Sequence, residues 1–150
     1  MTPSVRIGDQ TSVRFARVVF TCAGIWGLVV LTPLYFSVDL VGRFYPPTIT
    51  HPDFFYGFIG VSLAWQVGFL LIGRDPEGLH AMMIPAMLEK FGYVFTLSVL
   101  YAQGTLRFGQ FVVAIPDFVL GMLFIFAFLQ VDAARRFPAS FVEYSNLFGD

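Results

Sequence analysis

Four long apolar runs constrain this chain more than any other feature of its sequence. Within its 150 residues, the runs cover positions 16–36, 54–73, 81–103 and 110–131. Each run is long enough to cross the roughly 30 Å hydrocarbon layer of a bilayer as a helix that rises ~1.5 Å per residue. The runs lack the strict alternation of polar and apolar residues that a membrane β-barrel requires. The sequence therefore predicts an all-α integral membrane protein, a four-transmembrane-helix bundle in one domain spanning 1–150.

Composition supports this prediction and excludes some functions. Hydrophobic residues make up 57% of the chain and charged residues only 13%, whereas a soluble domain has roughly 25% charged residues. The net charge of -1 provides no basic surface for nucleic acid. Cys22 is the only cysteine, so an intramolecular disulfide or a Cys-x-x-Cys redox pair is excluded. We expect Cys22 to be buried in helix packing.

The arginines predict the orientation of the bundle. They fall mainly on one side of the four runs, at Arg6, Arg14, Arg17, Arg74, Arg135 and Arg136. The other side has only Arg43 and Arg107. Because basic residues concentrate on the cytoplasmic side, we expect both termini in the cytoplasm, in a bacterial inner membrane. The first run is longer than the apolar region of a typical signal peptide, so we expect it to be retained as a helix.

Residues outside the runs predict helix starts. Asp75 precedes Pro76 and Glu77, a sequence typical of an N-cap and a first helical turn. Thr50 or His51 is expected to cap the second helix in the same way. We interpret these residues as structural.

Small residues predict where helices approach each other. Gly60, Ala64 and Gly68 recur every fourth residue in the second run, a spacing that lets a neighbouring backbone come close. Ala23 and Gly27 form a shorter version in the first run. These residues are predicted to serve helix packing.

Three charged residues lie well inside the predicted membrane spans, away from their ends, at Glu89, Lys90 and Asp117. A charge at that depth is costly and is often functional. At ~1.5 Å per residue, Lys90 lies roughly 13 Å and Asp117 roughly 19 Å from the cytoplasmic boundary, so the lysine side chain can bridge the two helices. Tyr93 and Gln66 lie at similar depths on the same estimate. We therefore expect one buried polar cluster of Glu89, Lys90, Asp117, Tyr93 and Gln66.

Prolines accompany these charges. Pro85 precedes Glu89 by one turn and Pro116 immediately precedes Asp117. Each proline removes the usual donor to the carbonyl four residues earlier. The sequence predicts kinked helices with free carbonyls beside the cluster, a feature also seen at transporter sites.

The cluster leaves three roles open. The charges can form an ion pair that only fixes the helix register, they can bind a ligand or partner, or they can carry protons or ions. His51 and His80 fall at opposite ends of the runs, so they cannot clamp one haem between them. Each remains a possible axial ligand to a pigment or haem, or a capping residue. The sequence has no metal-binding motif, and it leaves the cofactor unknown.

Three functions are consistent with these features. The first is a small noncatalytic membrane protein, either an accessory subunit of a larger complex or a binder of a lipid, quinone or pigment. The second is a small oligomeric proton-coupled transporter that uses Glu89, Lys90 and Asp117. The third is a membrane enzyme acting on an apolar substrate, with Glu89 as acid or base. The expected partners are membrane lipids and either a homo-oligomer or a larger membrane complex.

Overall fold

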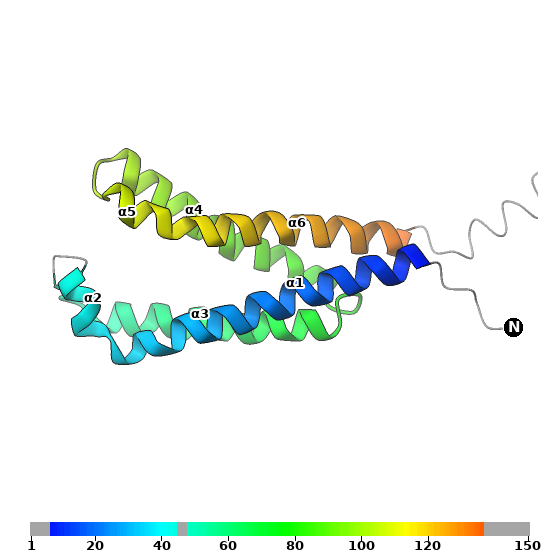
Figure 1. The fold of residues 1–150 in the computed structure, drawn as a ribbon, viewed down its shortest axis with the longest axis horizontal. Helices are drawn as coiled ribbons and strands as arrows, with labels where there is room; N and C mark the ends of the chain where they lie inside the picture. Colours follow the sequence, from blue (N-terminus) through cyan, green and yellow to red (C-terminus); the bar gives the residue numbers. More distant parts are fainter. Residues whose placement is uncertain (1–6, 45–47, 137–150) are drawn as a thin grey trace, which may run out of the picture.

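The computed structural model describes residues 7–44 and 48–136, and every regular element of these residues is helical (Figure 1). The chain runs through α1 (Ile7–Leu31), η1 (Thr32–Phe36), α2 (Val38–Phe44), α3 (Pro52–Arg74), η2 (His80–Met82), α4 (Met83–Ala102), α5 (Phe108–Phe111), η3 (Val112–Ala114) and α6 (Ile115–Arg136). The η elements are short 3-10 helices.

Four helical stretches are long and apolar enough to cross a membrane. They are Gln10–Phe36, Pro52–Arg74, His80–Ala102 and Phe108–Arg136. These stretches contain the predicted runs, except that the third ends one residue earlier than expected. The prediction of four membrane-length helices is therefore confirmed. Helix α2, which lies in the connection between the first two spans, was not predicted.

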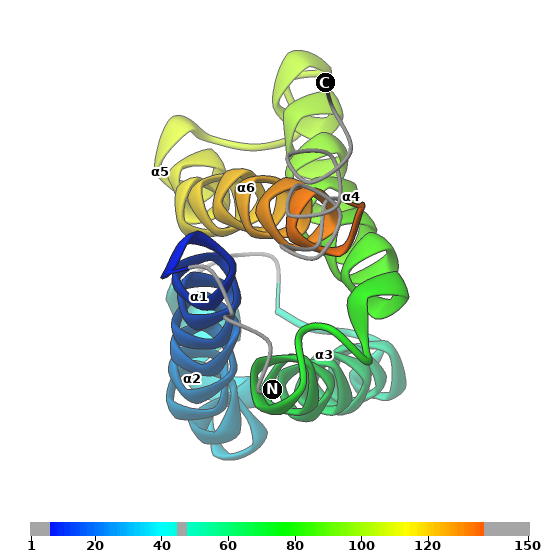
Figure 2. The same ribbon diagram turned by 90° about the vertical axis from the view of Figure 1, so that its right-hand side faces the viewer.

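The four long helices form a ring when the bundle is viewed along its axis (Figure 2). Helix α1 packs extensively against both α3 and α6, and α6 also packs against α4. Helices α3 and α4 are joined by a short connection but make few contacts. The first residues of α1 and the last residues of α6 lie at the same end of the bundle, and α2 and α5 lie at the other end (Figure 1).

Prolines and 3-10 turns interrupt the spans at their ends and not in their middle. Helix α1 gives way to η1 at Thr32, next to Pro33, whose ring cannot continue an α-helix. Pro85 and Pro116 lie in the first turns of α4 and α6, where a missing N–H is tolerated. The Val112 carbonyl accepts a hydrogen bond from the Ile115 N–H. The expectation of a free Val112 carbonyl is therefore wrong, and the predicted kinks stay a prediction.

The expected caps also differ from the structure. His51 is the N-cap residue of α3 but makes no side-chain cap hydrogen bond. Its Nδ1 instead lies 2.9 Å from the Thr50 hydroxyl oxygen. Asp75 ends α3, and its carboxylate accepts a 2.9 Å hydrogen bond from the Gly78 N–H. It therefore stabilises the turn between the helices, and α4 starts later, at Met83.

A compact core fills the half of the bundle that contains both described chain ends. Phe20, Phe69 and Phe124 are fully buried and come from three different helices. The Phe20 and Phe124 rings stack at 4.1 Å between centroids, and Phe69 meets Phe124 edge-on at 5.1 Å. Smaller side chains complete this cluster, among them Ala16, Ala23, Ala86 and Ala127. Close ring contacts fix how α1, α3 and α6 meet in this half.

Close approach between α1 and α3 depends on glycine. A Cβ added to Gly24 would lie 2.8 Å from the Gln66 carbonyl oxygen, and one added to Gly27 would overlap the Gln66 side chain. Gly27 therefore serves packing as expected. In the predicted stripe, Ala64 is exposed, and Gly60 and Gly68 are only half-buried. The predicted helix-packing role of that stripe stays a prediction.

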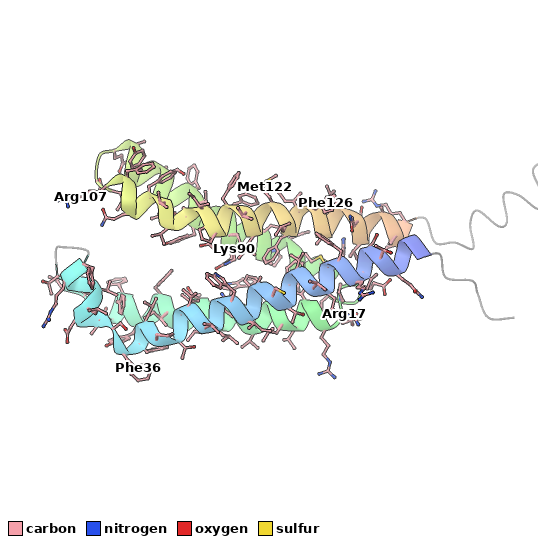
Figure 3. All side chains as sticks on the ribbon, viewed as in Figure 1. Arg17, Phe36, Lys90, Arg107, Met122 and Phe126 are labelled. Atoms are coloured by element: carbon pink, nitrogen blue, oxygen red, sulfur yellow. The ribbon has the colours of Figure 1, made fainter. Side chains whose placement is uncertain are left out.

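Much of the surface is apolar, as a lipid-exposed bundle requires. In the most apolar stretch of each long helix, only 17% to 28% of the residues are buried. Met122 and Phe126 point away from the bundle, whereas Lys90 points into the space between the helices (Figure 3). Cys22 is exposed, so the expectation that it is buried is wrong. With four such helices the chain is a membrane protein.

Candidate functional site

A cavity of about 480 Å³ lies between the long helices, in the half of the bundle beyond the aromatic core. This volume is within the usual range for small-molecule sites, about 300–1,000 Å³. All four long helices contribute to its lining, which is mostly apolar and aromatic and includes Trp26, Val30, Phe58, Val61, Trp65, Tyr93, Val113 and Leu120. Glu89, Lys90 and Asp117 also line it. The predicted charges therefore face a cavity and not a packed helix interface.

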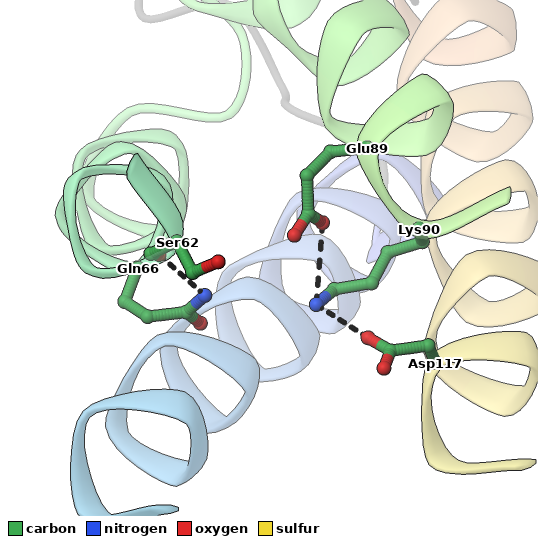
Figure 4. Close-up of polar contacts among 5 residues, drawn as sticks. All are labelled: Ser62, Gln66, Glu89, Lys90 and Asp117. Carbon is green, nitrogen blue, oxygen red and sulfur yellow. Dashed lines mark hydrogen bonds and ion pairs between the residues drawn. The ribbon is translucent and has the colours of Figure 1, made fainter. Parts of the chain in front are cut away.

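The structure brings the three charged side chains together (Figure 4). The Lys90 ammonium donates a 2.6 Å hydrogen bond to the Asp117 carboxylate and lies 3.2 Å from Glu89 Oε2. The side-chain exposures are 7% for Lys90, 21% for Glu89 and 24% for Asp117. Lys90 thus joins α4 to α6 from inside the membrane-spanning region. A short charge-assisted bond of this kind is strong where water is scarce.

Lys90 also connects this cluster to the aromatic core. Its ammonium lies 5.1 Å from the centroid of the Phe69 ring. A cation over an aromatic face is attracted by the electron density of the ring. The charged cluster therefore lies where the packed half of the bundle meets the cavity.

The cluster carries one more negative charge than positive when all three groups are ionised. Asp117 holds the Lys90 ammonium by the short hydrogen bond. Glu89 Oε2 is enclosed and has no hydrogen-bond partner among the described residues, although the Lys90 ammonium is within ion-pair distance. A buried carboxylate oxygen without a donor is energetically costly. Glu89 is therefore the least satisfied group of the site.

The other predicted members of the cluster line the same cavity. Gln66 is buried on α3, opposite the charges, and donates a 2.9 Å hydrogen bond to the Ser62 carbonyl (Figure 4). Tyr93 stacks on Phe58 with ring centroids 6.3 Å apart. These residues therefore add amide and phenol groups to a mainly apolar wall.

The two histidines lie outside the lining of this cavity. His51 is exposed at the start of α3. His80 is buried at the start of the third span, where its ring stacks on Phe128 at 4.3 Å and its Nε2 lies 3.3 Å from the Phe128 carbonyl oxygen. Within residues 7–44 and 48–136, no three His, Cys, Asp or Glu side chains gather in a metal-binding arrangement. An axial-ligand role for either histidine stays a prediction.

A second cavity of about 710 Å³ lies at the α2 and α5 end. Its lining includes Leu34 of η1, Phe44 and other residues of α2, and Arg107 and Gln110. Leu34 lines both this cavity and the one that holds Glu89. The two cavities are therefore adjacent, and Leu34 lies between them.

Sequence reasoning missed the aromatic walls of the inner cavity. Trp26 and Trp65 lie near the middle of their predicted spans, although tryptophan usually concentrates at the membrane interfaces. That unusual depth was the available signal. The second cavity had no comparable signal, because it depends on how α2 and the residues before α5 fold.

Comparison with protein families, with curated proteins and with solved structures gives no match for this chain.

Proposed function

We propose that this chain is a small noncatalytic membrane protein that binds an apolar molecule with one polar end. The ligand belongs to the broad class of lipids, quinones and pigments. The observation that carries this proposal is the inner cavity, whose walls are aromatic and aliphatic and whose polar groups gather around Lys90. Ligand sites commonly combine an apolar lining with a few polar groups that orient the ligand.

The geometry favours binding over catalysis. The Lys90 ammonium already contacts both carboxylates, so it is poorly placed to act as a nucleophile or base. The Asp117 carboxylate is held by the same ammonium at 2.6 Å. Glu89 alone keeps an unsatisfied oxygen, and a single carboxyl suits the recognition of one ligand group better than a multistep reaction.

Two glycines provide a matched test of this proposal. Gly92 lines the inner cavity, whereas Gly57 lies outside its lining, and a Cβ added to either would meet no heavy atom within 4 Å beyond its chain neighbours and the nearby backbone of its own helix. We expect Gly92→Leu to fill part of the cavity and Gly57→Leu to leave it open. After gentle extraction from the host membrane, intact-complex mass spectrometry should show a small molecule bound to wild type and Gly57→Leu, but less of it on Gly92→Leu.

Equal ligand occupancy in all three proteins would contradict the proposal, because the retained molecule would then lie outside the cavity. The same mass measurement reports the assembly state. We propose that the protein acts as a homo-oligomer or as an accessory subunit of a larger membrane complex. A mass equal to one 16.8 kDa chain plus ligand would contradict the proposed assembly and leave the proposed ligand binding untouched.

A proton-coupled transporter is the second candidate, favoured by two observations. The inner cavity contains a carboxylate that lacks a hydrogen bond, and a second cavity adjoins it at Leu34. Together they outline a route from one end of the bundle to Glu89. In proteoliposomes, Glu89→Gln should abolish pH-driven uptake of a ligand found by mass spectrometry, and unchanged uptake would remove this candidate.

We also propose that the chain ends face the cytoplasm of a bacterial cell. Arg14, Arg17, Arg74, Arg135 and Arg136 belong to the chain-end side of the bundle, and Arg43 and Arg107 to the other side. Arg6 lies outside the described residues. A thiol added at Gly109, next to Arg107, should react with a membrane-impermeant reagent on intact spheroplasts, while labelling only after lysis would reverse the orientation.

A further inference from the structure

We infer that the polar end of the ligand is a cationic group, such as a protonated amine, that contacts the Glu89 carboxylate. This inference rests on the proposed binding function and specifies its ligand class. The observations that carry it are the charge balance of the cluster, the Glu89 oxygen that points away from Lys90 and the aromatic walls of the cavity.

The charge balance favours a cation over an anion. Two carboxylates surround one ammonium, so the ionised cluster has a net charge of -1. Lys90 is engaged most closely by Asp117, at 2.6 Å, and is farther from Glu89, at 3.2 Å. A cationic ligand group near Glu89 would neutralise the cluster, whereas a carboxylate or phosphate there would add repulsion in a region of low dielectric constant.

The hydrogen-bonding pattern of Glu89 points the same way. Its Oε2 is enclosed beside the Lys90 ammonium, 3.2 Å away, whereas its other oxygen points away from Lys90 toward the side of Gln66 (Figure 4), and the residue belongs to the cavity lining. An ammonium group presents several N–H donors and can satisfy a carboxylate from the cavity side. A carbonyl group, such as that of a quinone, has no donor to offer an ionised Glu89.

Aromatic side chains surround the space beside Glu89. Trp65, Phe58 and Tyr93 line the cavity from α3 and α4, and Trp26 lines it from α1. Rings of this kind attract cations through their faces and also accommodate an apolar chain. The protein already uses this interaction once, where Lys90 lies over Phe69. The combination of a surplus carboxylate and aromatic walls therefore fits a lipophilic amine.

The test uses two probes that differ only in their polar end, 12-bromododecylamine and 12-bromododecanol. The full chain is placed in lipid nanodiscs at pH 7, and quenching of tryptophan fluorescence by the bromine atom is measured as each probe is added. Trp26 and Trp65 are the only tryptophans of the chain, and both line the cavity. Saturable quenching therefore reports a probe bound in or beside it.

We expect the amine to bind wild-type protein at least about tenfold more tightly than the alcohol, because charge-assisted hydrogen bonds are about twice as strong as neutral ones. Glu89→Gln should remove this preference and leave alcohol binding in place, which also shows that the variant keeps its cavity. Glu77→Gln is the matched control, because Glu77 is exposed in the turn before α4 and lies outside the cavity lining.

Each of the other possible results shows whether the cationic-group inference or the proposed binding function is wrong. Equal binding of both probes to wild type, or an amine preference that survives in Glu89→Gln, would overturn the cationic-group inference and leave the binding function intact. A preference for the alcohol would indicate that Glu89 holds a proton and donates to a neutral acceptor, which also overturns the inference. Quenching that never saturates, or that is unchanged in Gly92→Leu, would overturn the proposed binding function itself.

Discussion

The two halves of this bundle are built from the same four helices but differ in how they are filled. Near the chain ends, Phe20, Phe69 and Phe124 pack against one another and are fully buried. Toward α2 and α5, the same helices enclose a cavity of about 480 Å³. Four apolar helices in a bilayer therefore need not pack along their whole length, because one well-packed half can hold them together.

Ring contacts distinguish the two halves. Large rings from three helices meet in the packed half, whereas Trp26 and Phe58, which line the hollow half, are 55% and 49% exposed. The charged cluster lies at the boundary, with Lys90 beside Phe69 on one side and the cavity on the other. We therefore expect the first half to contribute most of the stability, and we propose that the second half binds the ligand.

Removing the cation at this boundary should have the largest effect. Lys90→Met leaves Glu89 and Asp117 without the ammonium that they share, and breaking a buried ion pair in this way destabilises by about 3–5 kcal/mol. The free energy of unfolding, measured in mixed micelles with increasing sodium dodecyl sulfate, should fall by that amount.

The triple variant Glu89→Gln, Lys90→Met, Asp117→Asn is the control for this prediction. It removes all three charges at once, so most of the lost stability should return. If Lys90→Met alone unfolds at the wild-type detergent fraction, the cluster contributes nothing to holding α4 against α6.

Truncating a ring in each half compares the two regions directly. Phe124→Ala should destabilise by about 3 kcal/mol, at the low end for a buried phenylalanine, because lipid already provides an apolar environment in the unfolded state. Phe58→Ala should destabilise by less than about 1 kcal/mol, since Phe58 lies at the cavity and is 49% exposed. The same unfolding titration measures both, and equal losses would show that the two halves do not differ in packing.

Adding a single methyl group sharpens the comparison with the smallest change. Gly24→Ala should destabilise by about 1–3 kcal/mol, because the new Cβ would lie 2.8 Å from the Gln66 carbonyl oxygen between α1 and α3. Gly92→Ala should stabilise by about 0.5–1 kcal/mol, because its Cβ meets open space and alanine favours the helix. We expect the unfolding titration to show a lower free energy of unfolding for Gly24→Ala and a higher one for Gly92→Ala. A change of the same sign in both variants would contradict the difference in packing between the two sites.

The sequence predicted the helices far better than the space between them. Apolar runs of membrane length were sufficient to locate all four spans. Depth along the helix axis also placed Lys90 within reach of Asp117, and the structure has them 2.6 Å apart. Both predictions depend on the rise per residue alone, a quantity that varies little between helices.

Features that depend on helix rotation or on neighbouring chain segments were harder to predict. Cys22 was expected to be buried and is exposed, because composition does not tell which face of α1 meets α3. Asp75 was expected to cap the third long helix. It instead stabilises the turn between α3 and α4. The cavity itself had no sequence signature beyond two unusually deep tryptophans, since a void results from the side chains of four helices together.

The 3-10 turn η3 (Val112–Ala114) changes the angular phase of the fourth span. A 3-10 helix advances about 120° per residue and an α-helix about 100°, so three residues add roughly 60° of rotation and lengthen the span by ~1.5 Å. From Gln110 to Asp117 the span rotates about 700° at a constant α-helical angle and about 760° with η3 included, so the two side chains stay within about 40° of one face. Gln110 lines the second cavity and Asp117 the inner one, so their separation along the axis, which η3 lengthens, lets a single membrane span present polar groups to two separate spaces.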